Sequence, residues 1–169
     1  MTAIKRLLVP TDFSAASSAA VRYAIDLATD LGATIHMLHV IEEWELTARH
    51  LEALCIELPG LRERVIEEAA DRLRTMAAGL GTALPIVTEV REGRPADVIV
   101  DVLRANAFDL IVMGTRGRTG VSHAVLGSVA ERVLRTAPCP VLTVRTGSSS
   151  AGEGTALAAE SRPERMTHA

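Results

Sequence analysis

Short apolar runs alternate with longer amphipathic stretches along most of this chain. Runs of about four to eight residues rich in Val, Ile and Leu, bounded by Gly or Pro, are typical of buried strands. The predicted strands are residues 6–9, 34–41, 85–90, 109–113 and 141–144. Because helical segments separate them, the pattern predicts an α/β fold, with an open, five-stranded parallel sheet and helices on both of its faces.

The intervening segments have the three- and four-residue spacing of apolar positions that marks one face of a helix. The first helix is predicted to begin after Ser14, a favoured N-cap residue, and to end at Gly32. Further helices are predicted over residues 61–80, from Pro95 onward, and over residues 128–135. The residues expected on the inner face of the first helix are Val21, Ala24, Ile25, Ala28 and Leu31.

Two segments fall outside this alternation. Residues 42–59 are long for a connection and are expected to form a partly helical excursion. From Gly147 the sequence is small and polar, and residues 147–169 are expected to be a disordered tail. A length of 169 residues suits one domain, so we expect residues 1–146 to form it.

Composition excludes several classes of function. Aromatic residues make up 2% of the chain and the formal charge is −3, which argues against stacking on single-stranded nucleic acid and against a basic surface for a duplex. Lys5 is the only lysine, so neither a lysine-containing phosphate loop nor a Schiff-base enzyme is expected. No apolar run approaches the ~20 residues of a membrane-spanning helix. With two cysteines and no signal-peptide pattern at the start, a reducing, cytoplasmic location is expected.

The two histidines of the second strand are not expected to form a metal site. His36 and His39 are three residues apart, which places them on opposite faces of a strand. No metal site is predicted elsewhere, and no motif of a hydrolase or metalloprotease occurs.

The most informative segment is the glycine-rich loop that follows the fourth strand. It begins where an apolar strand ends and finishes at the start of a helix, a place where open α/β sheets bind ligands. The groups that suit a phosphate are the glycines Gly114, Gly117 and Gly120, the arginines Arg116 and Arg118, and the helix-start residues Ser128 and Val129. On the residues alone, simple turn chemistry remains the alternative interpretation.

Several separated motifs of this chain agree in order and spacing with those of one known family. Two residues separate Gly114 from Gly117, and nine separate Gly117 from Gly127 and the adjoining Ser128. The other motifs are IKRLLVPTDFS, IHMLHVI, EGRPADVIV, DLIVMGTRGRTG and APCPVLTVR. In these motifs the chain resembles the ATP-binding branch of the universal stress protein family. The resemblance extends over residues 3–146.

The resemblance implies a Rossmann-like sheet with strand order 3-2-1-4-5 and ATP, with Mg²⁺, bound where strands 1 and 4 part. The residues implied on the adenine and ribose side are Pro10, Thr11, Asp12 and Val40. Those implied along the loop are Met113, Gly114, Arg116 and Gly117, and those implied at the phosphates are Gly127, Ser128 and Val129. Asp12 has an alternative interpretation, as a cap ahead of the first helix.

These features favour a nucleotide-dependent regulatory or stress-response module over an enzyme. The chain offers binding groups without an evident catalyst, so fast ATP hydrolysis is not expected, although slow hydrolysis remains open. The resemblance also implies a homodimer through the last strand, and a regulatory module implies a further protein partner. Two alternatives remain: a nucleotidyl or phosphoryl transferase that uses the same cleft, and a structural dimer without a ligand.

Overall fold

Five parallel strands form one sheet in the order β3-β2-β1-β4-β5, as expected. The computed structural model describes residues 3–42, 60–115 and 126–145, so the predicted tail and the excursion beyond Glu42 lie outside the described residues. The strands are β1 (Arg6–Pro10), β2 (Thr34–Ile41), β3 (Ile86–Glu92), β4 (Leu110–Gly114) and β5 (Val141–Val144). The helices are α1 (Ala15–Leu31), α3 (Leu61–Ala78), α4 (Pro95–Ala105) and α5 (Ser128–Thr136).

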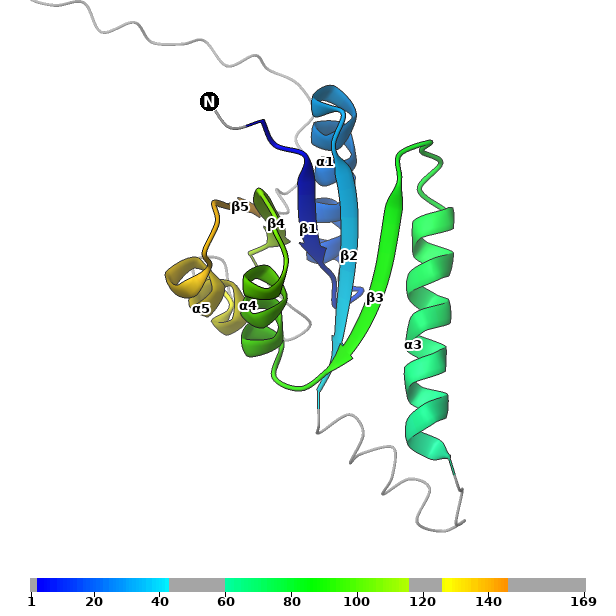
Figure 1. Cartoon of the computed structure of the whole chain (residues 1–169). Coiled ribbons are helices and arrows are strands. Elements are labelled where there is room, and N and C mark those ends of the chain that lie inside the picture. Colours follow the sequence, from blue (N-terminus) through cyan, green and yellow to red (C-terminus); the bar gives the residue numbers. More distant parts are fainter. Residues whose placement is uncertain (1–2, 43–59, 116–125, 146–169) are drawn as a thin grey trace, which may run out of the picture.

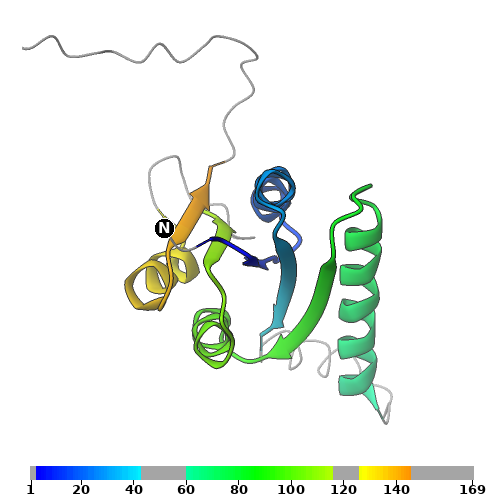
Figure 2. The same ribbon diagram turned by 45° about the horizontal axis from the view of Figure 1, so that its top comes forward.

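The helices cover both faces of the sheet. Figures 1 and 2 show α1 and α3 on one face and α4 and α5 on the other. Successive residues of β1 therefore enter different cores: Leu7 and Val9 pack with α1, whereas Leu8 packs with α4 and α5. This alternation explains why the buried strands are apolar at nearly every position.

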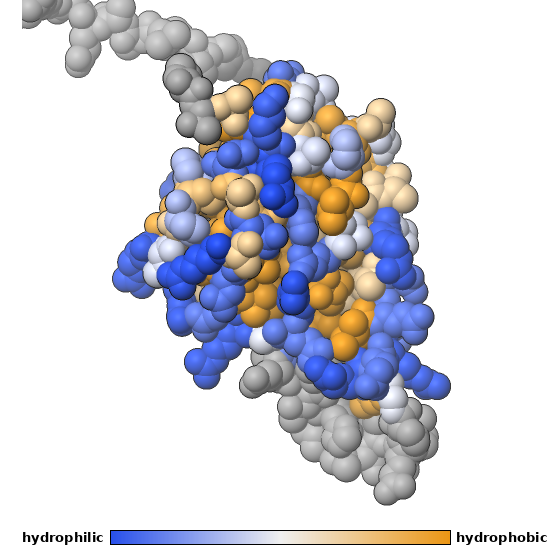
Figure 3. Space-filling model, viewed as in Figure 1, coloured by the Kyte–Doolittle hydropathy of each residue, from blue (hydrophilic) through white to orange (hydrophobic). Residues whose placement is uncertain are grey.

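The face that carries α4 and α5 is covered incompletely near β3. Figure 3 shows apolar side chains among polar ones on this face, and Val87 of β3 is 54% exposed. His36 and Glu89 lie beside each other there, with 2.6 Å between the His36 Nε2 and a carboxylate oxygen of Glu89. No helix in the described ranges is long and apolar enough to cross a membrane.

Local signals predicted the bounds of α1 well. The Ser14 hydroxyl accepts a hydrogen bond from the Ser17 N–H, and Gly32 ends the helix in the left-handed conformation with a φ of 60°. The expected burial of Leu31 is wrong, because this side chain is 40% exposed. Leu31 is the last residue of α1, immediately before the Gly32 that ends the helix and close in sequence to the start of β2 at Thr34.

The connections that follow β1 and β4 leave the sheet on opposite faces, which opens a space for a ligand between these two strands. β1 and β4 are adjacent and parallel. The chain leaves β1 for α1 on one face, whereas the helix that follows β4 is α5 on the other face. The carboxyl ends of two neighbouring strands therefore part, which is the usual position of a ligand cleft in an open α/β sheet.

Candidate functional site

A pocket of about 520 Å³ lies at the carboxyl ends of β1, β2 and β4, beside the starts of α1, α4 and α5. The structure brings together in its wall every predicted site residue that it describes. These residues are Pro10, Thr11, Asp12, Val40, Met113, Gly114, Gly127, Ser128 and Val129. The predicted Arg116, Gly117 and Arg118 lie outside the described residues.

Other residues that line the pocket were not predicted from the sequence. They are Ser17, Leu38, His39, Glu42, Pro95, Ile99, Thr115 and Ala130. Pro95 and Ile99 come from α4, which follows β3 in the chain but packs over the centre of the sheet. The position of β2 beside β1 could have indicated His39, because both strands end at the same edge of the sheet.

Asp12 lies in a short turn between β1 and α1. One oxygen of its carboxylate accepts a hydrogen bond from the Ser14 N–H at 3.0 Å. The N-cap of α1 is Ser14 and not Asp12, so the capping interpretation of Asp12 is wrong, although its carboxylate does stabilise the turn. The carboxylate also lines the pocket, where it is available to a ligand.

The electrostatic state of Asp12 follows from its surroundings. Partial burial acts to raise the pKa of the Asp12 carboxyl, but hydrogen bonds from Ser14 and Ser17 outweigh that effect, so the pKa lies below its usual value. Asp12 is therefore a carboxylate at neutral pH, suited to accept hydrogen bonds from hydroxyl or amine groups.

Buried hydroxyl groups fix this turn against α1. The Thr11 hydroxyl donates to the Ser17 hydroxyl at 3.1 Å and accepts from the Phe13 N–H at 3.1 Å. Ser17 in turn donates to the Ser14 carbonyl oxygen at 3.0 Å. Thr11 and Ser17 are 5% and 4% exposed, so this network is shielded from water and holds the turn in one arrangement.

The start of α5 forms another part of the wall. Gly127 is its N-cap and has no side chain that could accept from the first amides of the helix. The Gly127 N–H donates to the Thr115 carbonyl oxygen at 2.8 Å, which ties the start of α5 to the end of β4. The amides of Ser128 and Val129 therefore begin a helix whose positive end lies at the pocket, an arrangement that suits an anion.

The described lining is acidic rather than basic. It contains the carboxylates of Asp12 and Glu42 and no lysine or arginine. Within these residues, the helix end at Ser128 is therefore the main feature that favours a negative group. The pocket accordingly offers an anion-binding end at α5 and acceptors for hydroxyl or amine groups elsewhere.

Fold and pocket together define a doubly wound α/β protein with a ligand cleft where the strand order reverses. The chain matches the model of the universal stress protein family over residues 3–145, and it belongs to that family. It is 37% identical over 141 residues to universal stress protein MJ0531 of Methanocaldococcus jannaschii, an alignment that covers 83% of this chain and 82% of the relative.

Solved structures show the same fold. The structure of MJ0577 from Methanocaldococcus jannaschii superposes with a TM-score of 0.73 at 28% identity, covering 88% of this chain and 100% of that one. A universal stress protein in complex with cAMP has a TM-score of 0.56 at 25% identity, covering 85% of this chain and 98% of that one. The family therefore includes a similar protein that was solved with an adenine nucleotide.

Proposed function

We propose that this protein binds an adenine nucleotide, with ATP as its principal ligand, in the pocket between β1 and β4. One observation carries the proposal: the predicted nucleotide residues that are described come from separate parts of the chain and line a single pocket. The cAMP complex of a similar protein supports the choice of an adenine nucleotide.

The expected pose follows from the charges of the pocket. The phosphates lie at the start of α5, where the amides of Ser128 and Val129 and the Ser128 hydroxyl can donate to them. The ribose or the base lies near Asp12, whose carboxylate accepts from a hydroxyl or amine group. Val40 and Met113 supply apolar surface for the remainder of the nucleoside.

Magnesium would enter this site with the nucleotide. The described part of the chain contains no group of three or more His, Cys, Asp or Glu residues that could hold a metal ion. Mg²⁺ commonly keeps several waters and binds through substrate phosphates, so the phosphates of ATP would be its main ligands here. Bound in that way, it would neutralise part of the phosphate charge.

The proposed role is regulatory: nucleotide occupancy changes what the protein presents to a partner protein. The residues assigned above bind and orient the nucleotide, and this role needs no chemical step. We also propose that the protein is a homodimer that pairs through β5. This four-residue strand pairs with β4 on one side, and its other edge carries no strand within the described residues.

A thermal unfolding experiment tests the proposed ligand. At a nucleotide concentration about a hundred times the Kd, binding stabilises the folded state by roughly 2.7 kcal/mol. For a domain of this size we expect a rise in Tm of roughly 5 to 10 °C with MgATP. Parallel runs with ADP, AMP, cAMP and GTP rank the ligands. An unchanged Tm with every adenine nucleotide at millimolar concentration would refute the proposal.

A further inference from the structure

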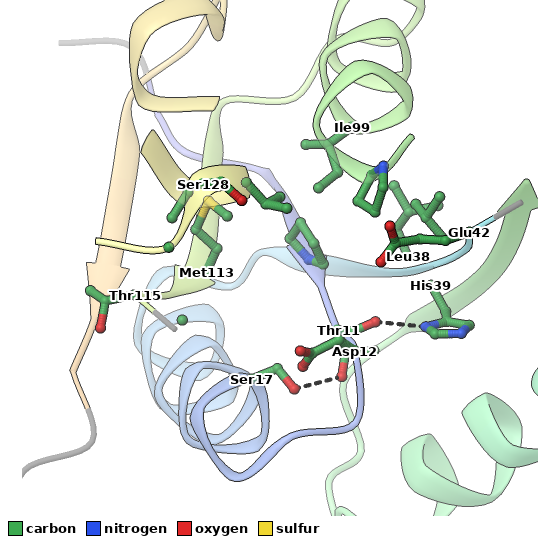
Figure 4. Close-up of a pocket in the computed structure, with 17 residues that line it drawn as sticks. Thr11, Asp12, Ser17, Leu38, His39, Glu42, Ile99, Met113, Thr115 and Ser128 are labelled. Atoms are coloured by element: carbon green, nitrogen blue, oxygen red, sulfur yellow. Dashed lines mark hydrogen bonds between the residues drawn. The ribbon is translucent and has the colours of Figure 1, made fainter. Parts of the chain in front are cut away.

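His39 lies beneath the turn that carries Asp12. It is 5% exposed, and its Nδ1 is 2.8 Å from the carbonyl oxygen of Thr11 (Figure 4). Because a carbonyl oxygen can only accept, Nδ1 must carry the hydrogen and donate it. Thr11 is thus held to β2 by two hydrogen bonds, one from His39 to its carbonyl oxygen and one from its own N–H to the Leu38 carbonyl oxygen at 2.8 Å.

The same imidazole also packs against Phe13, the residue after Asp12. The two ring centroids are 4.4 Å apart, and the ring planes are inclined at 45°. On α3, the guanidinium carbon of Arg72 lies 4.1 Å from the centroid of the Phe13 ring. Phe13 is therefore held by contacts from β2 and from α3, two elements that approach the turn from outside it.

These contacts stabilise Phe13 in an unfavourable backbone conformation. Its φ is 62°, and it is the one residue other than glycine with a positive φ in the described part of the chain. A bulky side chain in the left-handed region is strained, and such a conformation persists only where the surrounding structure imposes it. This strained residue lies directly between Asp12 and the N-cap Ser14, so it sets the direction in which the turn leaves β1.

We propose that His39 is a positioning residue of the nucleotide site, which holds the turn of residues 11–14 in the conformation that presents the Asp12 carboxylate to the ligand. The proposal rests on the proposed function, because it needs a ligand at Asp12. His39 acts through Thr11 and Phe13, and its contribution is to order the turn before the nucleotide arrives. Without the hydrogen bond from His39 to the Thr11 carbonyl oxygen, the nucleotide would have to order the turn as it binds, and its affinity would fall.

Two variants distinguish the role of the His39 hydrogen-bond donor from the role of its aromatic ring. His39→Phe keeps an aromatic ring against Phe13 but removes the donor, leaving the Thr11 carbonyl oxygen without this partner. His39→Asn removes the ring but can place an amide N–H near the former Nδ1. We expect calorimetry to show an ATP affinity about tenfold weaker for His39→Phe, and within about threefold of wild type for His39→Asn.

His36 supplies the matched control. It lies on the same strand, but on the opposite face, where it contacts Glu89 and the ring of Phe108 and does not line the pocket. His36→Phe is therefore expected to leave ATP affinity at the wild-type value, whatever its effect on Tm. A general loss of stability through changes in β2 would instead affect both histidine variants alike.

A double-mutant cycle with Asp12 tests whether His39 acts through that carboxylate. In an Asp12→Asn background, the further change His39→Phe should weaken ATP binding by less than twofold, because the group that it positions is already altered. An unchanged affinity for folded His39→Phe, or a full tenfold further loss in the Asp12→Asn background, would overturn the proposal. A wild-type protein that binds no nucleotide would overturn the proposed function instead.

If His39→Phe does not fold, the ATP affinity of His39→Asn still tests the proposal. His39→Asn then has to bind ATP within about threefold of wild type, since it retains the donor that the proposal makes essential. A fall of clearly more than threefold in the ATP affinity of His39→Asn would contradict the proposal.

Discussion

Gly114 at the end of β4 lies directly against the backbone of Ala16 in the first turn of α1. A Cβ atom at Gly114 would be 3.0 Å from both the carbonyl carbon and the carbonyl oxygen of Ala16, and 3.2 Å from the Ser17 N. The contact closes the space between β4 and α1 on one side of the pocket. Glycine is required here by the lack of space, since Gly114 is not among the residues with a positive φ.

Gly114→Ala should therefore destabilise the fold. The added methyl group meets backbone atoms of a helix start, which cannot move aside as a flexible side chain can, so we expect a loss of roughly 1–3 kcal/mol in the free energy of unfolding. Urea unfolding measures it. Gly79→Ala is the matched control, because Gly79 has a φ of −73° and its nearest contact would be 3.4 Å away. Equal stability of the two variants would contradict this prediction.

Ser128→Ala should weaken ATP binding without altering the fold. Ser128 is exposed at the start of α5, and the change removes one hydroxyl donor, worth about 0.5–1.5 kcal/mol, or roughly two- to twelvefold in Kd. Calorimetry with ATP checks this, and Thr136→Ala at the other end of α5 is the control that should bind as wild type does. If Ser128→Ala binds ATP with unchanged affinity, its hydroxyl does not contact the phosphates.

The edge of β5 gives a direct test of the proposed homodimer. The carbonyl oxygen of Pro140 accepts from the Ile111 N–H of β4, and that of Val144 accepts from the N–H of Thr115, the residue after β4. Because alternate residues of a parallel strand bond to the same neighbour, the N–H and C=O groups of Thr143 point to the open edge. Thr143→Pro removes that outward N–H and should yield monomers that remain folded, because proline is tolerated on edge strands.

Sedimentation velocity at micromolar concentration distinguishes these states, with Thr143→Val as the control that keeps the N–H and should remain dimeric. A wild-type protein that sediments as a monomer would show that β5 is not a dimer interface under these conditions. A Thr143→Pro protein that dimerises with the wild-type dissociation constant would likewise show that the dimer does not form through β5.

Asp109 should make the stability of the fold depend on pH. Backbone N–H groups of Lys5 and Arg6 donate to one oxygen of its carboxylate, at 2.8 and 2.9 Å, and hold the pKa of this carboxyl below its ordinary value of 3.8. Since the folded pKa is the lower one, the carboxylate stabilises the fold fully above about pH 4, and this contribution is lost as the pH falls through the folded pKa.

Asp109→Asn should therefore be less stable than wild type at pH 7, and the difference should shrink as the pH falls below about 4. Urea unfolding at a series of pH values measures this, with Asp101→Asn on the exposed side of α4 as the control for loss of a charge. A difference between Asp109→Asn and wild type that is as large at pH 2.5 as at pH 7 would argue against an ionic contribution.

Local sequence signals predicted the elements, because caps and apolar runs act over a few residues. Ser14 and Gly32 bound α1 as predicted, and the range of β5 was predicted without error. His36 and His39 lie on opposite faces of β2, as the strand periodicity required. The strand order came from the family resemblance, since local patterns do not determine which strands are neighbours.

The parts of the site that were not predicted depend on tertiary packing. His39 reaches the pocket because β2 pairs with β1, and the sequence offered no sign that its imidazole would contact the carbonyl of Thr11. Ile99 lines the pocket because α4 crosses from β3 to the centre of the sheet. The left-handed conformation of Phe13 could not be predicted from the sequence either, since phenylalanine seldom adopts it.

Native mass spectrometry of the purified protein is the sharpest test of nucleotide binding, because it measures the mass of the folded protein together with any bound ligand. We expect the freshly purified protein, or the stripped protein after addition of MgATP, to carry one ATP per chain, and we expect GTP at the same concentration to compete poorly. Denaturing the sample should release intact nucleotide. A folded protein whose mass shows no bound nucleotide in millimolar MgATP, ADP and AMP would refute the proposal that it binds an adenine nucleotide.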